Sequence, residues 1–200
     1  MRCKRIMFVI FAGIFLLMSK PVFLWAEEPG RLIMGTIEKS LSIRKEVSVD
    51  GKVDKQMCEI RLWEEIAPLF NLEESSKRAL GQHWRNLTHE EKKEFVELFT
   101  DIIKEAYLGQ ACTSTGEKFV YLSEKQDDKY AKVLTKFITN TGTEISVDFR
   151  LLNNQGKWSI YDVVIEGVSL VNNYRSQFNS ILVKSSYEEL IQMIKEKKSK

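Results

Sequence analysis

The 200-residue chain is predicted to adopt an α+β fold, in which about six helices cover an antiparallel sheet of four to five strands. Apolar residues recur every three to four positions before residue 110 and after residue 169, which is typical of amphipathic helices. Between residues 118 and 165 this period falls to two, the spacing of half-buried strands. Short segments rich in Asn and Gly, 140–142 and 153–156, separate those strands and favour hairpin turns.

Composition agrees with a globular protein: 44% of the residues are hydrophobic and 29% are charged. Only three prolines and ten glycines are present, which excludes collagen-like and low-complexity chains.

Three helices are expected in the first part of the chain. The first extends over residues 30–47 and ends before the turn sequence Asp50-Gly51. The second begins at Asp54 and ends near Phe70, and the third extends from about Leu72 to Arg85. The apolar stripe of the first helix consists of Leu32, Ile33, Ile37 and Leu41.

The clearest predicted helix begins after Thr88. The Thr88 side chain can accept the amide hydrogen of Glu91, while the Glu91 carboxylate accepts that of Thr88, a capping box. We expect this helix to end near Gly109. Its apolar face is wide and comprises Phe95, Leu98, Phe99, Ile102, Ile103, Ala106 and Tyr107.

Four strands are predicted over residues 118–123, 130–139, 143–152 and 157–165. In the third strand one face is apolar and the other is expected to meet water; the water-facing residues are Glu144, Ser146, Asp148 and Arg150. In the fourth strand both faces are apolar, so it is expected to be central or covered on both sides. One face would hold Tyr161, Val163 and Ile165, and the other Trp158, Ile160 and Val164.

Two further helices are predicted after the sheet. Ser169 is a suitable N-cap for the first, and Ser186 with Glu189 forms a second capping box for the other.

The first 26 residues are predicted to be a cleaved signal peptide. Arg2, Lys4 and Arg5 precede an apolar run of residues 6–18, and Ala26 offers a small residue for cleavage. The run is shorter than the roughly 20 residues that a membrane-spanning helix needs. The segment holds four of the 30 basic residues and no acidic one, so 26 basic and 28 acidic residues remain, a net charge of −2. This balance argues against nucleic-acid binding, which needs a surplus of Lys and Arg.

Two cysteines remain after the predicted cleavage, Cys58 and Cys112. In an oxidising compartment they could form a disulfide that closes a long loop. They could equally be two buried thiols that pack as small apolar groups.

No catalytic or metal-binding motif is found in the sequence. The two histidines, His83 and His89, are six residues apart and have no ligand cluster near them. Asp162 lies within the most apolar strand, where burial could make it a general base. Alternatively, it pairs with an arginine such as Arg150 or accepts backbone N–H bonds, and this structural role is favoured.

Several motifs in order resemble the toluene-tolerance (MlaC) family of periplasmic phospholipid-binding proteins. One is the segment LGQHWRNLTHEEKKEFVELF at residues 80–99, followed by Glu105-Ala106-Tyr107. The more specific match is the ordered series DFR (148–150), GKW (156–158), YD (161–162), EGVS (166–169) and RSQF (175–178).

This resemblance implies a cone-like fold, similar to the nuclear-transport-factor architecture, and a single lipid-binding domain over residues 27–200 with a helical subdomain. It implies a periplasmic carrier with no cofactor and no catalytic activity. Phospholipid would pass between an inner-membrane ABC-type lipid transporter complex and an outer-membrane lipoprotein complex. Large apolar residues would line the acyl-chain cavity: Trp84, Phe95, Phe99, Ile103, Tyr107, Val147, Phe149, Val163, Ile165, Tyr174 and Phe178.

Three alternatives remain open from the sequence, one of which is a purely structural or chaperone-like interaction protein. The cavity could carry another apolar molecule, such as a hopanoid-like terpenoid, because apolar periodicity does not determine the shape of a pocket. Otherwise the same fold could form an isomerase or hydrolase that uses Asp162.

Overall fold

The computed structural model describes residues 28–50, 52–113 and 118–198, so the predicted signal peptide lies outside it. The α-helices of this part are α1 (Pro29–Glu46), α2 (Lys55–Ile66), α3 (Leu72–Leu80), α4 (His89–Thr113), α5 (Leu170–Leu182) and α6 (Tyr187–Lys198). Two 3₁₀ segments, η1 (Ala67–Leu69) and η2 (Gly81–Asn86), follow α2 and α3. A two-stranded ribbon, β1 (Ser48–Val49) and β2 (Lys52–Val53), connects α1 to α2.

The main sheet contains β3 (Lys118–Gln126), β4 (Tyr130–Ile138), β5 (Glu144–Asn154), β6 (Lys157–Ile165) and β7 (Val168–Ser169). Their spatial order follows the sequence and every neighbouring pair is antiparallel. The α+β prediction of an antiparallel sheet with about six helices is therefore confirmed for the described residues.

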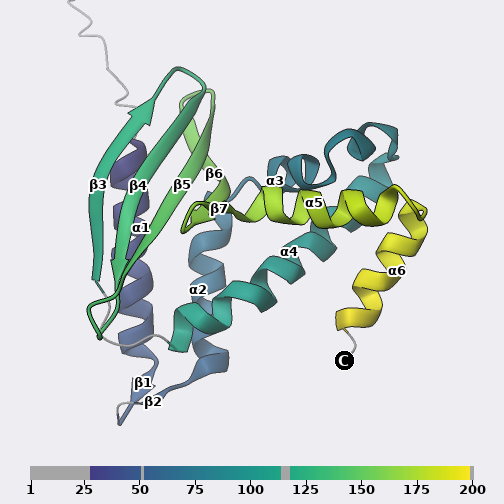
Figure 1. Cartoon of the computed structure of the whole chain (residues 1–200). Helices are drawn as coiled ribbons and strands as arrows, with labels where there is room; N and C mark the ends of the chain where they lie inside the picture. Colours follow the sequence, from purple (N-terminus) through teal and green to yellow (C-terminus); the bar gives the residue numbers. More distant parts are fainter. Residues whose placement is uncertain (1–27, 51, 114–117, 199–200) are drawn as a thin grey trace, which may run out of the picture.

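The molecule divides into a sheet part and a helical part (Figure 1). Helix α1 lies along one face of the sheet beside β3 and β4, and α3, α5 and α6 lie beyond the β6–β7 edge, while α4 runs from them back toward α2. Gly30 at the start of α1 donates its N–H to Glu124 Oε2 of β3 at 2.6 Å. The three predicted caps that open helices are present, at Thr88, Ser169 and Ser186.

The predicted face assignment of the fourth strand is wrong, because β6 contains a bulge. Ile160 pairs with Leu151, whereas Asp162 pairs with Arg150, so Tyr161 is the extra residue. The bulge puts Trp158 and Ile160 on the same face as Val163. The Tyr161 carbonyl accepts a hydrogen bond from the Ser75 hydroxyl of α3 at 2.8 Å, which joins the bulge to the helical part.

The outer face of β5 is only partly exposed, which corrects the prediction that its polar residues all meet water. Asp148 is buried, and its Oδ2 forms an ion pair with Lys132 Nζ at 2.8 Å. Arg150 is partly buried because it reaches Asp162 beside the start of α5.

Three predicted helix ends also differ from the structure. The second helix ends at Ile66, because Pro68 lacks the amide hydrogen that a continuing helix needs. The third ends at Leu80, where Gly81 adopts a φ of +60° and η2 begins. Gly109 does not end α4, which continues to Thr113. A Cβ there would lie 3.2–3.3 Å from the side chains of Glu59 and Lys55, so this glycine permits the close approach of α2.

Cys58 of α2 and Cys112 of α4 form a disulfide with a Cα–Cα distance of 5.9 Å. The alternative that the sequence left open is therefore resolved in favour of the bridge. It lies in a small apolar cluster that includes Leu62 and Leu108. The bridge ties α2 to the C-terminal end of α4.

Candidate functional site

Asp162 is held by partners that account for its burial. Its side chain accepts hydrogen bonds from Arg150 Nη1 at 3.0 Å, the Ser169 hydroxyl at 2.7 Å and the Val171 amide at 3.1 Å. Only 3% of the residue is exposed. This arrangement joins β6 to the first turn of α5, because both Ser169 and Val171 belong to that junction. It is the structural role favoured from the sequence.

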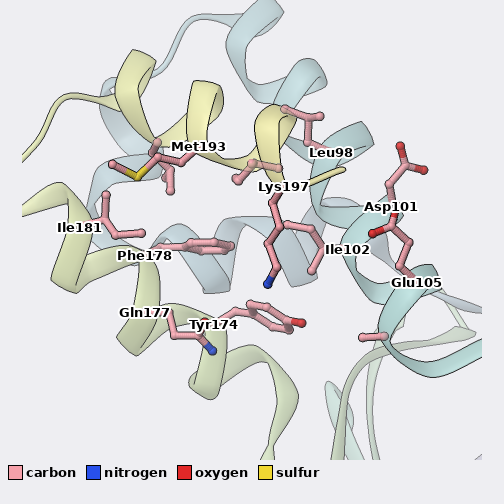
Figure 2. Close-up of a pocket in the computed structure, with 13 residues that line it drawn as sticks. Leu98, Asp101, Ile102, Glu105, Tyr174, Gln177, Phe178, Ile181, Met193 and Lys197 are labelled. Atoms are coloured by element: carbon pink, nitrogen blue, oxygen red, sulfur yellow. The ribbon is translucent and has the colours of Figure 1, made fainter. Parts of the chain in front are cut away.

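A largely apolar hollow lies in the helical part, between α4, α5 and α6, and we call it the α5 groove (Figure 2). Its volume is about 370 Å³. Spacings of three and four residues place the lining side chains of each helix on one face. Helix α4 contributes Leu98, Ile102 and Ala106, α5 contributes Tyr174, Phe178 and Ile181, and α6 contributes Leu190, Met193 and Ile194.

The floor of the α5 groove is a cluster of aromatic rings. Tyr174 stacks on Phe178 with ring centres 5.7 Å apart, and both rings meet Phe99 edge-on. Phe95 lies behind them, fully buried. Such contacts give the floor a fixed apolar surface.

Charged and polar side chains form the rim. Asp101 and Glu105 of α4 lie along one side, and Lys197 and Gln177 complete the lining. Burial raises the pKa of Tyr174, and the neighbouring Tyr107 adds to this effect, so the Tyr174 phenol stays neutral at neutral pH. The groove is thus apolar inside and charged only where it opens, which suits an amphiphilic ligand.

The structure distributes the eleven predicted lipid-contacting residues over two clusters. Seven belong to helices or 3₁₀ segments of the helical part: Trp84, Phe95, Phe99, Ile103, Tyr107, Tyr174 and Phe178. Of these, Tyr174 and Phe178 line the α5 groove, while Trp84, Phe95 and Phe99 are buried in the core.

The remaining four lie on the α1 side of the sheet in register, as the pairs Val147–Ile165 and Phe149–Val163. Phe149 and Val163 pack on the core cluster between α1 and the sheet. The structure therefore does not bring all eleven residues into one cavity.

Several residues that line the groove were absent from the predicted site, among them Ile181, Leu190 and Ile194. Their helical spacing marks an apolar face on α5 and α6. Periodicity alone does not tell whether such a face fills a core or lines a groove.

Among the described residues, no group of three or more His, Cys, Asp and Glu side chains is arranged to hold a metal ion. In the same part of the chain, no helix combines the length and the apolar character needed to cross a membrane.

Comparison with known proteins agrees on one family. A family model described as MlaC protein matches residues 35–196. The intermembrane phospholipid transport system binding protein MlaC of Haemophilus influenzae is 25% identical over 132 residues, which cover 64% of this chain. The match spans 62% of that relative's own length.

A solved structure shares the fold. It is the phospholipid-binding protein from Ralstonia solanacearum in complex with a phospholipid, with a TM-score of 0.70 and 20% sequence identity. The superposition covers 81% of this chain and 94% of that one. The family model extends over most of the sequence, from within α1 to the last turn of α6. The chain therefore belongs to the MlaC family.

Proposed function

We propose that the protein is a periplasmic carrier that binds phospholipid and moves it through the aqueous space between two membranes. The observation that carries this proposal is the α5 groove, an apolar hollow with a charged rim on a chain of the MlaC family. Two similar proteins, one named as an intermembrane phospholipid transport binding protein and one solved with a phospholipid, support the choice of ligand.

The physical need for such a carrier follows from the cost of exposing acyl chains. Each methylene moved into water costs about 0.8 kcal/mol, so roughly thirty methylenes cost on the order of 24 kcal/mol. A groove lined by Leu, Ile and Phe replaces bilayer contacts with similar ones. Transfer from membrane to protein is then close to thermoneutral and needs no cofactor or covalent step.

In this proposal the mature domain starts after the signal peptide of residues 1–26. It receives or delivers lipid at an inner-membrane ABC-type transporter complex and at an outer-membrane lipoprotein complex. Tyr174 and Phe178 contact the acyl chain directly. The other predicted lipid contacts in the helical part, such as Phe95 and Phe99, support the floor beneath them. No catalytic role is proposed for Asp162.

A substitution that fills the groove tests the proposal. Ala106 is exposed and lines the groove, so Ala106→Trp places an indole in the space of the acyl chain while leaving the core intact. Displacing even three methylenes costs about 2.4 kcal/mol, roughly a sixty-fold loss of affinity. Ala111→Trp is the matched control, since Ala111 is exposed on the same helix and outside the groove lining.

The measurement is native mass spectrometry of the protein purified from cells, before and after delipidation and reloading with phospholipid. The proposal expects bound phospholipid in the wild type and in Ala111→Trp, and little in Ala106→Trp. Wild-type protein that neither retains nor takes up phospholipid would refute it. A bound terpenoid instead would identify the alternative carrier.

A further inference from the structure

The face of the main sheet that is turned away from α1 (Figure 1) carries a row of positive charges on three neighbouring strands. Lys125 of β3 lies directly opposite Lys132 of β4, and Lys132 lies directly opposite Arg150 of β5. Their chain neighbours Val133 and Leu151 are buried in the core cluster between α1 and the sheet. Because successive side chains of a strand point to opposite faces, the three cations lie on the other face.

This row of like charges lowers the stability of the sheet by itself. Residues directly opposite each other have Cβ atoms about 4.5–5.5 Å apart, and like charges in such positions repel. Two buried carboxylates offset part of the repulsion: Asp148 pairs with Lys132 at 2.8 Å, and Asp162 pairs with Arg150 at 3.0 Å. Lys125 is exposed and forms no ion pair within the described part of the chain. The row therefore keeps a positive charge that a bound anion would neutralise.

The row borders a shallow hollow of about 320 Å³, which we call the sheet hollow. All three cations line it, together with one acidic residue, Asp127. The Asp127 Oδ1 atom is engaged in its own turn, where it accepts two backbone N–H bonds at 2.8 and 2.7 Å. Asp148 and Asp162 hold their partners from beneath and do not line the hollow. The sheet hollow thus presents mainly N–H donors to solvent.

Two tyrosines form a fixed wall of the sheet hollow. Tyr130 and Tyr161 both line it, and their ring centres are 6.2 Å apart. Arg78 of α3 holds both rings: its Cζ lies 4.1 Å from the centre of the Tyr161 ring, and its Nη2 donates to the Tyr130 hydroxyl at 3.5 Å. Glu74 of the same helix pairs with Arg78 at 2.8 Å and fixes its direction. The wall therefore keeps its shape without a ligand.

The donors of the sheet hollow suit a phosphate group better than a carboxylate. A phosphate presents acceptor oxygens in several directions, whereas a carboxylate presents two oxygens in one plane. The Arg150 guanidinium has five N–H donors and its Nη1 serves Asp162, so others are left for a ligand. At about 320 Å³ the hollow lies near the lower end of the ~300–1,000 Å³ range of ligand sites, which fits a small polar group.

We propose that the sheet hollow is an anion site that binds a phosphate group between Lys125, Lys132 and Arg150. Two sources offer this chemistry: a soluble phosphate compound, and the headgroups of an anionic membrane surface. The sheet hollow and the α5 groove have no lining residue in common, so the proposal does not depend on what the α5 groove carries.

The test reverses one charge of the row. Lys125→Glu changes an exposed side chain that has no ion pair in the described residues, so the fold should be unaffected. Lys118→Glu is the matched control, because Lys118 is exposed on the same strand and does not line the hollow. Lys125→Arg keeps the charge. Each protein is titrated with inorganic pyrophosphate and followed by its amide NMR signals. Each is also sedimented with vesicles of dioleoylphosphatidylcholine, with and without dioleoylphosphatidylglycerol.

The proposal expects at least one probe to bind at the row. Pyrophosphate that shifts the amides around Lys125 and Lys132, without sedimentation on anionic vesicles, identifies a soluble phosphate as the source. Sedimentation that needs phosphatidylglycerol identifies the membrane headgroups. In either case Lys125→Glu should weaken binding at least fivefold, while Lys118→Glu and Lys125→Arg stay within twofold of wild type. Binding of neither probe, or an equal loss in Lys125→Glu and Lys118→Glu, would overturn the site.

Discussion

Asp162→Asn gives the most informative test of how the sheet is joined to the helical part. In the wild type, one carboxylate oxygen accepts bonds from Arg150 and from the Ser169 hydroxyl, and the other accepts the Val171 amide. An asparagine keeps one acceptor for Val171. Its amide group then faces the Arg150 guanidinium, so that bond is lost, and the Ser169 hydroxyl can keep a bond only by turning to accept from the amide.

The size of the effect follows from these contacts. Hydrogen bonds to a charged group contribute about 1.5–3 kcal/mol each. Because 35% of the Arg150 side chain is exposed, it can turn to water and recover part of this loss. We therefore expect Asp162→Asn to lower the free energy of unfolding by about 2–4 kcal/mol. For a chain of this size that corresponds to a fall in Tm of about 4–16 °C.

The assay is thermal and urea unfolding of delipidated protein, since bound lipid would add its own stabilisation. Asp148→Asn is the control: Asp148 is buried on the same face, and its one ion pair is with Lys132. Asp148→Asn should lower the free energy of unfolding by clearly less than Asp162→Asn does. A fall of less than about 0.5 kcal/mol in Asp162→Asn would refute the structural role. Loss of an enzymatic turnover without loss of stability would favour catalysis instead.

Three further predictions concern stability. Replacing Cys58 and Cys112 together by Ala should cost about 4 kcal/mol in urea unfolding, because the disulfide closes a loop with a sequence separation of 54; an unchanged midpoint would contradict this. Burial, and to a smaller extent the nearby glutamates, raises the pKa of Tyr187 above its ordinary value of about 10. The folded protein therefore favours the protonated phenol. This contribution to stability is complete below about pH 10 and is lost as the pH rises from the unfolded pKa toward the folded one. Tyr187→Phe should therefore remove part of the fall in unfolding free energy between about pH 9 and 12. At pH 7 the same variant should lower the free energy of unfolding by about 1 kcal/mol, because the hydrogen bond to the Glu91 carbonyl is lost. Parallel curves of stability against pH for the two proteins would contradict this prediction. Gly30→Ala should lower the free energy of unfolding by about 1–3 kcal/mol, because a Cβ there collides with side chains of β3. An unchanged Tm would contradict this prediction and would show that the β3 side chains can move aside.

The fold class could be predicted because the two apolar periods are local properties of the sequence. Capping residues such as Thr88 and Ser186 also act within one turn, and both open helices as expected. The bulge at Tyr161 could not be predicted. It shifts the pairing by one residue, and it depends on α3, which binds the freed carbonyl through Ser75.

The candidate site was harder to predict, since a groove depends on distances between helices. Phe95 and Ile102 belong to the same apolar face of α4, yet Phe95 is fully buried and Ile102 lines the groove. Phe95 packs edge-on against Phe178 of α5, a contact between helices that no local pattern contains. Gly109 illustrates the same limit: its role lies in the approach of α2 and not in the end of its own helix.

The central claim is that the protein moves phospholipid by enclosing acyl chains beside α4. The most direct test follows labelled dioleoylphosphatidylethanolamine from donor to acceptor vesicles of different density, with increasing amounts of protein. We predict a transfer rate that rises in proportion to wild-type protein and falls to the spontaneous rate with Ala106→Trp. A wild-type rate no faster than the spontaneous one, or equal acceleration by Ala106→Trp, would contradict the account.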